Sequence, residues 1–239
     1  MGGSEPGSLI LEPFPEPIVP RSMEGLLPKK WIEEDCSSLS ALELGAGTGL
    51  FTRHLDLRAF KSFRATDVSG SMIAEGELWL PKVNWESLNA WKCEDSIEVD
   101  RLYACSLLQW SKQPLDALEK WRALLRPNGK FLGCLFVAGS SEELSGEENR
   151  LGGFEWRSER HWRSYFEEAK LSIKRYDTRL DKESYDSPMQ VLRRLHDLGA
   201  TLYQNMSPGR LRQHLKRLKT RNKRFDVSWK TLRLECTVD

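Results

Sequence analysis

The chain has 239 residues, and its 36 basic and 35 acidic side chains leave a net charge of +1. Overall charge therefore favours neither nucleic acid nor any other charged partner, which would have to meet a local patch. With 39% hydrophobic residues, the chain can bury one α/β domain with additions, or two small domains. Its longest apolar runs, such as residues 131–139, are too short to cross a bilayer, and we recognise no secretory signal.

The five cysteines are odd in number and widely spaced, so they form neither a disulfide framework nor a metal knuckle. We expect reduced core thiols, no metal site and a cytoplasmic protein. Residues 1–28 hold six of the eleven prolines, which oppose helix formation and leave little to bury. This segment is predicted to be a flexible arm, followed by one domain over residues 29–239.

Strands and helices alternate in the first half of the domain. Short apolar runs predict strands at 39–45, 62–67, 82–88, 99–108 and 130–139. Helical spacing is found at 49–57, at 69–80 after a small polar cap, and from Pro114 to Leu125, where Pro127, Asn128 and Gly129 end the pattern. The alternation predicts βαβ units and a mostly parallel sheet with helices on both faces.

The second half reads differently. A polar stretch precedes a helix in the second part of 150–171, and residues 171–180 alternate as a strand. A further helix is predicted over 187–201, with Ser187 as its cap, and a basic helix over 207–222. Residues 225–238 alternate as a closing strand. We expect segments of about 140–170 and 187–222 to form a small helical cap inserted into the domain.

Three glycines, at 45, 47 and 49, follow the first predicted strand in the sequence ELGAGTG. A turn without side chains lets backbone N–H groups approach a ligand. A dinucleotide site requires a small residue at the third marked position of G-x-G-x-x-G, where this chain has Leu50. The pattern is instead E-x-G-x-G-x-G, which resembles the first motif of class I S-adenosylmethionine-dependent methyltransferases.

That resemblance implies a cofactor site. In this family, the glycine turn passes the amino-acid portion of S-adenosylmethionine and the acidic residue anchors its amino group. An acid at the end of the next strand accepts hydrogen bonds from the ribose hydroxyls, a methionine covers the adenine, and residues after strands three and four complete the site. The positions that match are Glu43, Gly45, Ala46, Gly47, Gly49, Asp67, Val68, Met72, Asn89, Ala90 and Cys105. The family fold implied is a Rossmann-like, seven-stranded sheet with an antiparallel last strand.

A longer stretch is more specific. The sequence LQW after the fourth strand, the RPNG after the next helix, the segment SYDSPMQVLRRLHDLGAT and the ending FDVSWKTLRLEC resemble the malonyl-acyl-carrier-protein O-methyltransferases of biotin synthesis. The resemblance covers about residues 40–239. It implies that the free carboxylate of a malonyl thioester, on acyl carrier protein or coenzyme A, is esterified. Two features differ: the proline-rich arm replaces an initial helix, and Glu155 stands near the position where the family often has a substrate-gripping arginine.

Substrate and partner residues follow from this resemblance. Gln109 and Trp110 would border the substrate, although packing over the cofactor also explains them. Arg150 and Arg157 are the candidates to hold the free carboxylate in a two-pronged contact. No general base is required, because a carboxylate is already ionised near neutral pH. An acidic carrier protein would dock on the basic helix by long-range attraction, through Arg210, Arg212, Lys216, Arg217 and Lys219.

Other functions stay open at this stage. The same domain could methylate another small carboxylate, or it could methylate RNA whose phosphates bind to the basic helix. A non-catalytic scaffold that binds an acidic partner is the third alternative. Glu43, Asp67 and the glycine turn argue against the scaffold, because a scaffold has no physical need for them.

Overall fold

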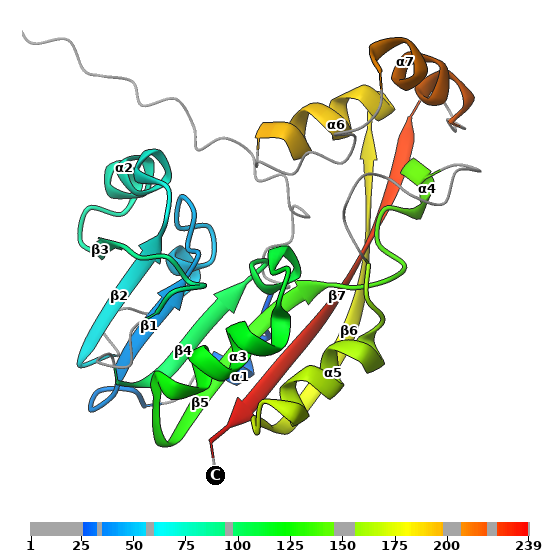
Figure 1. The fold of residues 1–239 in the computed structure, drawn as a ribbon. Helices are drawn as coiled ribbons and strands as arrows, with labels where there is room; N and C mark the ends of the chain where they lie inside the picture. The colour runs from blue at the N-terminus through cyan, green and yellow to red at the C-terminus, as the bar shows by residue number, and fades with distance from the viewer. Residues whose placement is uncertain are drawn as a thin grey trace, which may run out of the picture.

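The computed structural model describes residues 26–32, 35–55, 60–93, 98–145, 156–197, 207–218 and 224–238. They form a seven-stranded sheet in the order β3-β2-β1-β4-β5-β7-β6 (Figure 1). Strands β1 to β5 run parallel, whereas β7 is antiparallel to both of its neighbours. The prediction of a mostly parallel, Rossmann-like sheet with an antiparallel last strand is confirmed. The strands are β1 (Ser40–Leu44), β2 (Ser62–Asp67), β3 (Asn84–Ser87), β4 (Val99–Cys105), β5 (Leu125–Phe136), β6 (Ser172–Tyr185) and β7 (Phe225–Thr237).

The helices begin where small polar residues or proline occur in the sequence. Side-chain oxygens of Ser69, Ser158 and Ser207 accept backbone hydrogen bonds in the first turns of α2, α5 and α7. Ser187 does the same before α6, and Pro114 occupies the first turn of α3. The helices are α1 (Lys29–Ile32), α2 (Gly70–Trp79), α3 (Pro114–Ala123), α4 (Glu142–Ser145), α5 (Glu159–Glu168), α6 (Pro188–Asp197) and α7 (Pro208–Arg217), with 3-10 turns η2 (Thr52–His54) and η4 (Leu108–Trp110).

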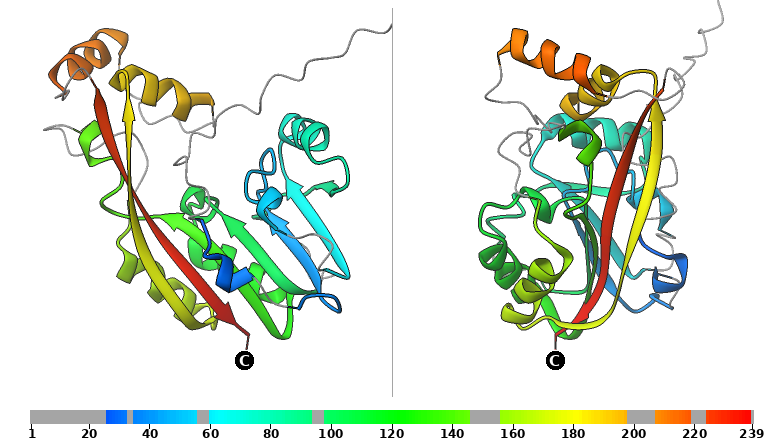
Figure 2. Two further views of the ribbon diagram at one scale, coloured as in Figure 1. Left: turned by 180° about the vertical axis from the view of Figure 1, so that it is seen from behind. Right: turned by 90° about the vertical axis from the view of Figure 1, so that its right-hand side faces the viewer.

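Both faces of the sheet are covered. On one face, Trp121 of α3 and Trp162 and Phe166 of α5 are buried in the main core. On the other face, Trp31 of α1 packs in a second cluster with Tyr103 of β4. Figure 2 shows α1 on the side of the sheet away from α3 and α5. The helices thus enclose the parallel strands and leave the carboxyl edge of the sheet for the loops.

Beyond the end of β5, strands β6 and β7 continue as a two-stranded ribbon, which we define as residues 180–185 and 225–230. The last β5–β7 pair is Phe136 with Thr231, whereas β6 and β7 stay paired up to Tyr185 with Phe225. Helices α4, α6 and α7 gather on this ribbon (Figure 1). They bury a small core of their own, made of Leu144, Tyr185, Val191, Leu218, Phe225, Val227 and Trp229.

Three expectations differ from the structure. Leu26 and Leu27 are buried, so the packed region starts before residue 29, inside the predicted arm. Helix α5, which lies in the predicted cap segment 140–170, instead packs on the sheet beside α3. The helix expected over 49–57 is represented by η2, because Leu55 takes an extended backbone (φ −84°, ψ 139°); residues 56–59 lie outside the described part.

Candidate functional site

The glycine turn follows β1 at the carboxyl edge of the sheet. All three of its glycines have positive φ: 64° at Gly45, 58° at Gly47 and 87° at Gly49. Residues with a Cβ rarely adopt this conformation, so the sequence requirement for glycine is explained by the backbone itself. The sequence-based prediction of a tight turn after the first strand is confirmed at these positions.

The three glycines face different surroundings. A Cβ at Gly45 would lie 2.7 Å from the side chain of Leu107, and one at Gly49 would lie 2.7 Å from Leu80. A Cβ at Gly47 would meet nothing within 4 Å. Gly45 and Gly49 therefore allow the turn to pack closely against Leu107 and Leu80, whereas the backbone of Gly47 faces open space.

Asp67 ends β2 directly beside this turn. Its carboxylate accepts a hydrogen bond from the backbone N–H of Gly47 at 2.9 Å and another from the N–H of Ser69 at 2.9 Å. One carboxylate thus joins the glycine turn to the start of α2. Each oxygen retains a further lone pair for a ligand hydroxyl, because a carboxylate offers about four acceptor positions.

Glu43 lies beneath the turn and is only 1% exposed. Its carboxylate accepts a hydrogen bond from the hydroxyl of Thr52 at 2.7 Å. Burial raises the pKa of Glu43 from its ordinary value of 4.5 to about 7; the Thr52 hydrogen bond opposes this rise, and the negative charge of Asp67 adds to it. Near neutral pH the carboxyl is therefore divided between its neutral and ionised forms.

The end of β4 forms the neighbouring part of the edge. Ser106 has a positive φ of 57°, an unusual conformation for a residue with a side chain. Its hydroxyl oxygen and Oε1 of Gln109 are buried without a hydrogen-bond partner among the described residues. Trp110 is 42% exposed, and its indole N–H donates to the carbonyl of Ser106 at 3.2 Å. Buried polar atoms of this kind are expected where a ligand or ordered water completes the bonding.

Cys105 precedes this turn and lies opposite Cys134 of β5 in the register. Burial raises the pKa of the Cys105 thiol well above its usual range, and the hydrogen bond with Cys134 raises it further. Such a thiol stays protonated and is a poor nucleophile. Its contribution at this edge is therefore shape and soft contact.

The third strand contributes Asn89 and Ala90. The N–H of Leu88 donates to the carbonyl of Asp67, which connects this segment to the end of β2. The Asn89 side-chain oxygen accepts from the N–H of Trp91 at 2.9 Å, and the Ala90 carbonyl accepts from the indole of Trp121 at 2.7 Å. The loop is fixed by these bonds, and the side-chain oxygen of Asn89 retains one acceptor position.

Two apolar side chains follow Asp67. Val68 is 67% exposed, which is high for a large hydrophobic residue. Met72, in the first turn of α2, is half-buried. An exposed valine beside a fixed carboxylate is suited to an apolar ligand ring next to a hydroxylated group.

The predicted substrate and docking residues are more dispersed. The carbonyl of Arg157 accepts from the N–H of Ala138 just beyond β5, and its guanidinium lies over the ring of Trp162, 5.3 Å from the centroid. The exposed basic residues Arg210, Arg212, Lys216 and Arg217 lie on α7, at the far end of the ribbon. Arg150 and Lys219 lie outside the described residues.

Sequence reasoning missed several residues that build this edge. Thr52 was not assigned a role, and Leu107 and Leu80 were not connected with the glycines that they contact. These contacts join residues far apart in the sequence, and only the fold reveals them. Thr52 ends the sequence GAGTGLFT, but no pattern in the neighbouring residues indicates that its hydroxyl donates to Glu43 of the preceding strand.

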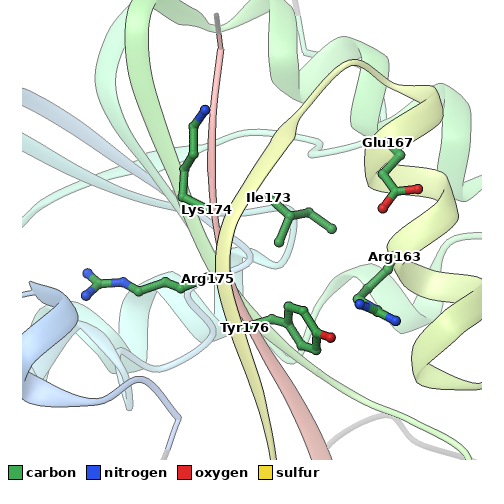
Figure 3. A pocket seen from close by; sticks show the side chains of 6 residues that line it. All are labelled: Arg163, Glu167, Ile173, Lys174, Arg175 and Tyr176. Atoms are coloured by element: carbon green, nitrogen blue, oxygen red, sulfur yellow. The ribbon is translucent and has the colours of Figure 1, made fainter.

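A cavity of about 360 Å³ lies elsewhere, between α5 and β6 (Figure 3). Ile173 and Tyr176 of β6 face Arg163 and Glu167 of α5 there, and the guanidinium of Arg163 lies 4.2 Å from the centre of the Tyr176 ring. The start of β6 aligns with the start of β5, which is the sheet edge opposite the glycine turn. This cavity is therefore separate from the candidate site.

The described ranges contain no group of three or more His, Cys, Asp or Glu residues placed to hold a metal ion. Among the helices described, none has the length and apolar character that crossing a membrane requires.

Comparison with known proteins relates this geometry to that of methyltransferases. A family model described as "Methyltransferase domain" matches residues 42–131, which include the glycine turn, Asp67 and the end of β4. Residues 42–131 are therefore similar to a methyltransferase domain, and the fold is that of the class I, S-adenosylmethionine-dependent methyltransferases. The chain is also 27% identical over 206 residues to malonyl-[acyl-carrier protein] O-methyltransferase from a Paenibacillus species; the match covers 77% of this chain and 75% of that protein.

Solved structures agree on the fold of this methyltransferase domain. The YcgJ protein from Bacillus subtilis superposes with a TM-score of 0.62 at 16% identity, over 87% of this chain and 94% of that one. A geranyl diphosphate C-methyltransferase from Streptomyces coelicolor, solved with S-adenosyl-L-homocysteine, superposes with a TM-score of 0.54 at 10% identity, over 88% of this chain and 75% of that one. At these identities the likeness extends to the fold alone.

The cofactor of the methyltransferase domain is S-adenosylmethionine, and the carboxyl edge of the sheet fits it. The open side of Gly47 leaves room for a ligand to approach bare backbone. Glu43 and Asp67 supply negative charge on the adjacent ends of β1 and β2, which suits a cationic ligand. Both features belong to the part of the chain that the family model matches.

Proposed function

We propose that this methyltransferase esterifies the free carboxylate of a malonyl thioester carried on acyl carrier protein, as in the biotin precursor route of the cytoplasm. The similarity to the malonyl-[acyl-carrier protein] O-methyltransferase, which extends over about three quarters of both chains, carries this proposal. It extends beyond the family-model range of 42–131, because it covers 77% of this chain.

The proposed cofactor contacts follow the geometry of the carboxyl edge. Asp67 accepts the ribose hydroxyls with the lone pairs that Gly47 and Ser69 leave. Val68 and Met72 cover the adenine, and Asn89 and Ala90 border it. Gly45, Ala46, Gly47 and Gly49 pass the amino-acid portion, and Glu43 supplies the negative charge beneath it. Cys105 lies under the sulfur.

The chemistry requires positioning rather than proton transfer. When bound, the cofactor supplies an electrophilic methyl group on a positively charged sulfur. The carboxylate of the acceptor is already ionised at neutral pH, so the protein has no proton to remove. The side chains of the β4 turn, Gln109 and Trp110, exclude water and border the acceptor, and alignment provides most of the rate.

Arg157 is the residue proposed to bind the malonyl carboxylate. It begins the segment that leads into α5, and its backbone is fixed to Ala138 at the end of β5. The Trp162 ring supports the guanidinium at 5.3 Å from the ring centroid, and a guanidinium is the group that binds a carboxylate through a two-pronged contact. Arg150 is the second candidate of the same chemistry.

The basic face of α7 is the proposed docking surface for the carrier protein. Arg210, Arg212, Lys216 and Arg217 are exposed, and α7 contains no acidic residue. The apolar side of α7 packs through Leu215 on the ribbon core. The helix therefore presents its cations to solvent from a fixed support, as steering of an acidic partner requires. Lys219 would extend this surface.

The deciding experiment is a transfer assay read by intact mass. The purified protein is incubated with labelled S-adenosylmethionine and malonyl acyl carrier protein, with acetyl acyl carrier protein as the matched control that lacks a free carboxylate. We expect a gain of one methyl group on the malonyl form only, removed again by an esterase. Methylation of both forms, or of neither while RNA or another carboxylic acid is methylated, would contradict the malonyl assignment and leave the methyltransferase domain unaffected.

A further inference from the structure

Glu43 is a buried acid with unusual surroundings. Glu43 is 1% exposed and comes just before the glycine turn, whose open side at Gly47 is the proposed place of the cationic cofactor. Two further polar contacts hold the same residue in place: the Thr66 hydroxyl donates to the Glu43 carbonyl at 2.7 Å, and the Thr52 hydroxyl donates to the carboxylate at 2.7 Å. Thr52 itself has no exposed surface. The carboxylate is therefore held in one orientation under the glycine turn.

We propose that Thr52 is a positioning residue, whose hydroxyl holds the Glu43 carboxylate as the buried counter-charge of the cofactor, and that cofactor binding releases a proton from Glu43. Thr52 does not touch the reacting atoms. Its hydrogen bond favours the ionised form, because a donated hydrogen bond is stronger to a carboxylate than to a neutral acid. The inference concerns the cofactor alone and is independent of the methyl acceptor.

The groups that act on Glu43 come from three elements. Thr52 of η2 lowers the pKa of the carboxyl, whereas burial and the charge of Asp67 at the end of β2 raise it. The Cys105 thiol of β4 also interacts with Glu43, and its own raised pKa keeps it neutral. Near neutral pH, Glu43 thus holds a proton in part of the molecules. A cation placed close to it stabilises the ionised form, so that binding expels the proton.

The linkage fixes the sign of the pH dependence. Below about pH 7 the cofactor must displace the proton, and its affinity is reduced. Above this pH the carboxylate is already ionised, and the affinity reaches a plateau. S-Adenosylhomocysteine lacks the positive charge on sulfur and should gain less from the ionised carboxylate. The preference for the methyl donor over the product should therefore increase as the pH rises from 6 to 8.

The first test measures proton release by titration calorimetry at pH 7 in two buffers of different ionisation enthalpy. The probes are S-adenosylmethionine and S-adenosylhomocysteine, and the proteins are wild type and Glu43→Gln. We expect wild type to release up to about half a proton more than Glu43→Gln on binding the methyl donor. Protons from the amino group of the ligand are common to both proteins and cancel in this comparison. Equal release by the two proteins would overturn the proposal.

The second test isolates Thr52. Thr52→Val removes the hydroxyl at nearly constant volume, and should weaken S-adenosylmethionine binding about tenfold at pH 7 and shift the midpoint of the affinity profile up by about one pH unit. Thr52→Ser should restore the midpoint. Thr178→Val is the matched control, because Thr178 donates to Glu159 at the same 2.7 Å distance between β6 and α5, away from the site. It should change neither quantity.

A merely structural role for Thr52 gives a different result. In that case Thr52→Val would weaken binding equally at all pH values, with an unmoved midpoint, and the positioning role would be wrong. If Thr52→Val does not fold, Thr52→Ala and the comparison of wild type with Glu43→Gln decide the question. Failure of the malonyl transfer assay leaves this measurement intact, because no acceptor is present.

Discussion

The cofactor edge and the β6–β7 ribbon differ in how they use polar residues. At the cofactor edge, Glu43 and Asp67 are fixed by short hydrogen bonds to residues of neighbouring elements. On the ribbon, the charged residues of α7 point to solvent, while a separate apolar core supports the helices. Buried charges require a defined partner, whereas exposed charges act over longer distances through the solvent. The two regions are therefore suited to different tasks: recognition of one small cation, and encounter with a macromolecule.

The largest effect expected from this difference is the pH dependence of stability at the buried edge. The folded protein holds a proton on Glu43 up to about pH 7, whereas the unfolded chain releases it near 4.5, so the folded state binds more protons between these values. The proton on Glu43 therefore contributes its whole stabilisation below pH 4.5. This contribution to the free energy of unfolding decreases by about 3 kcal/mol as the pH rises to 7. Urea unfolding at pH 5 and pH 8 should show this slope in wild type and a smaller one in Glu43→Gln. Parallel slopes would contradict the assignment.

A similar effect is expected at Asp67. Asp67→Ala removes the acceptor of the Gly47 N–H and the proposed acceptor of the ribose, and should weaken S-adenosylmethionine binding about a hundredfold in calorimetry. Asp226→Ala is the control on the ribbon, where the carboxylate accepts from the Ser184 hydroxyl. It should leave cofactor affinity unchanged. An unaltered affinity in Asp67→Ala would move the ribose site elsewhere.

On the ribbon, the corresponding test reverses charge. Changing Arg212, Lys216 and Arg217 together to Glu should lower kcat/KM for malonyl acyl carrier protein about tenfold at low salt, and less at high salt, because exposed charges are screened. The value of kcat/KM for malonyl-coenzyme A should change little. A similar loss with both substrates would show that the surface does not select the carrier protein. Cofactor affinity, measured in parallel, should stay at the wild-type value.

The smallest effect concerns the support of α7. A ring nitrogen of His214 lies 2.8 Å from the carbonyl oxygen of Leu144 in α4. His214→Ala should destabilise the docking of α7 by about 1 kcal/mol, seen as roughly fivefold faster amide exchange in that helix. The exchange of β1 and β2 should be unaffected, because their core is separate. Faster exchange throughout the molecule would mean that the ribbon and the sheet unfold as one unit.

Local patterns were sufficient wherever a few neighbouring residues decide the structure. A tight turn was predicted from the three glycines at 45, 47 and 49, which all have positive φ. Helix starts were predicted from Pro114 and Ser187. Helix α5 shows the limit. Its periodicity indicates a buried face, but the same pattern fits a cap or the surface of a sheet, and Trp162 and Phe166 in fact pack against α3 and the strands.

The sequence by itself determined the alternation of strands and helices, the glycine turn and the acid at the end of the second strand, because each depends on the conformational preferences of a short segment. Only the tertiary structure decided that the Thr52 hydroxyl donates to the Glu43 carboxylate and that the Leu107 side chain packs against Gly45. It also decided that β6 and β7 extend past the rest of the sheet and support α7. These contacts join distant segments. Their energy comes from burial and from hydrogen bonds that exist only once the strands have paired.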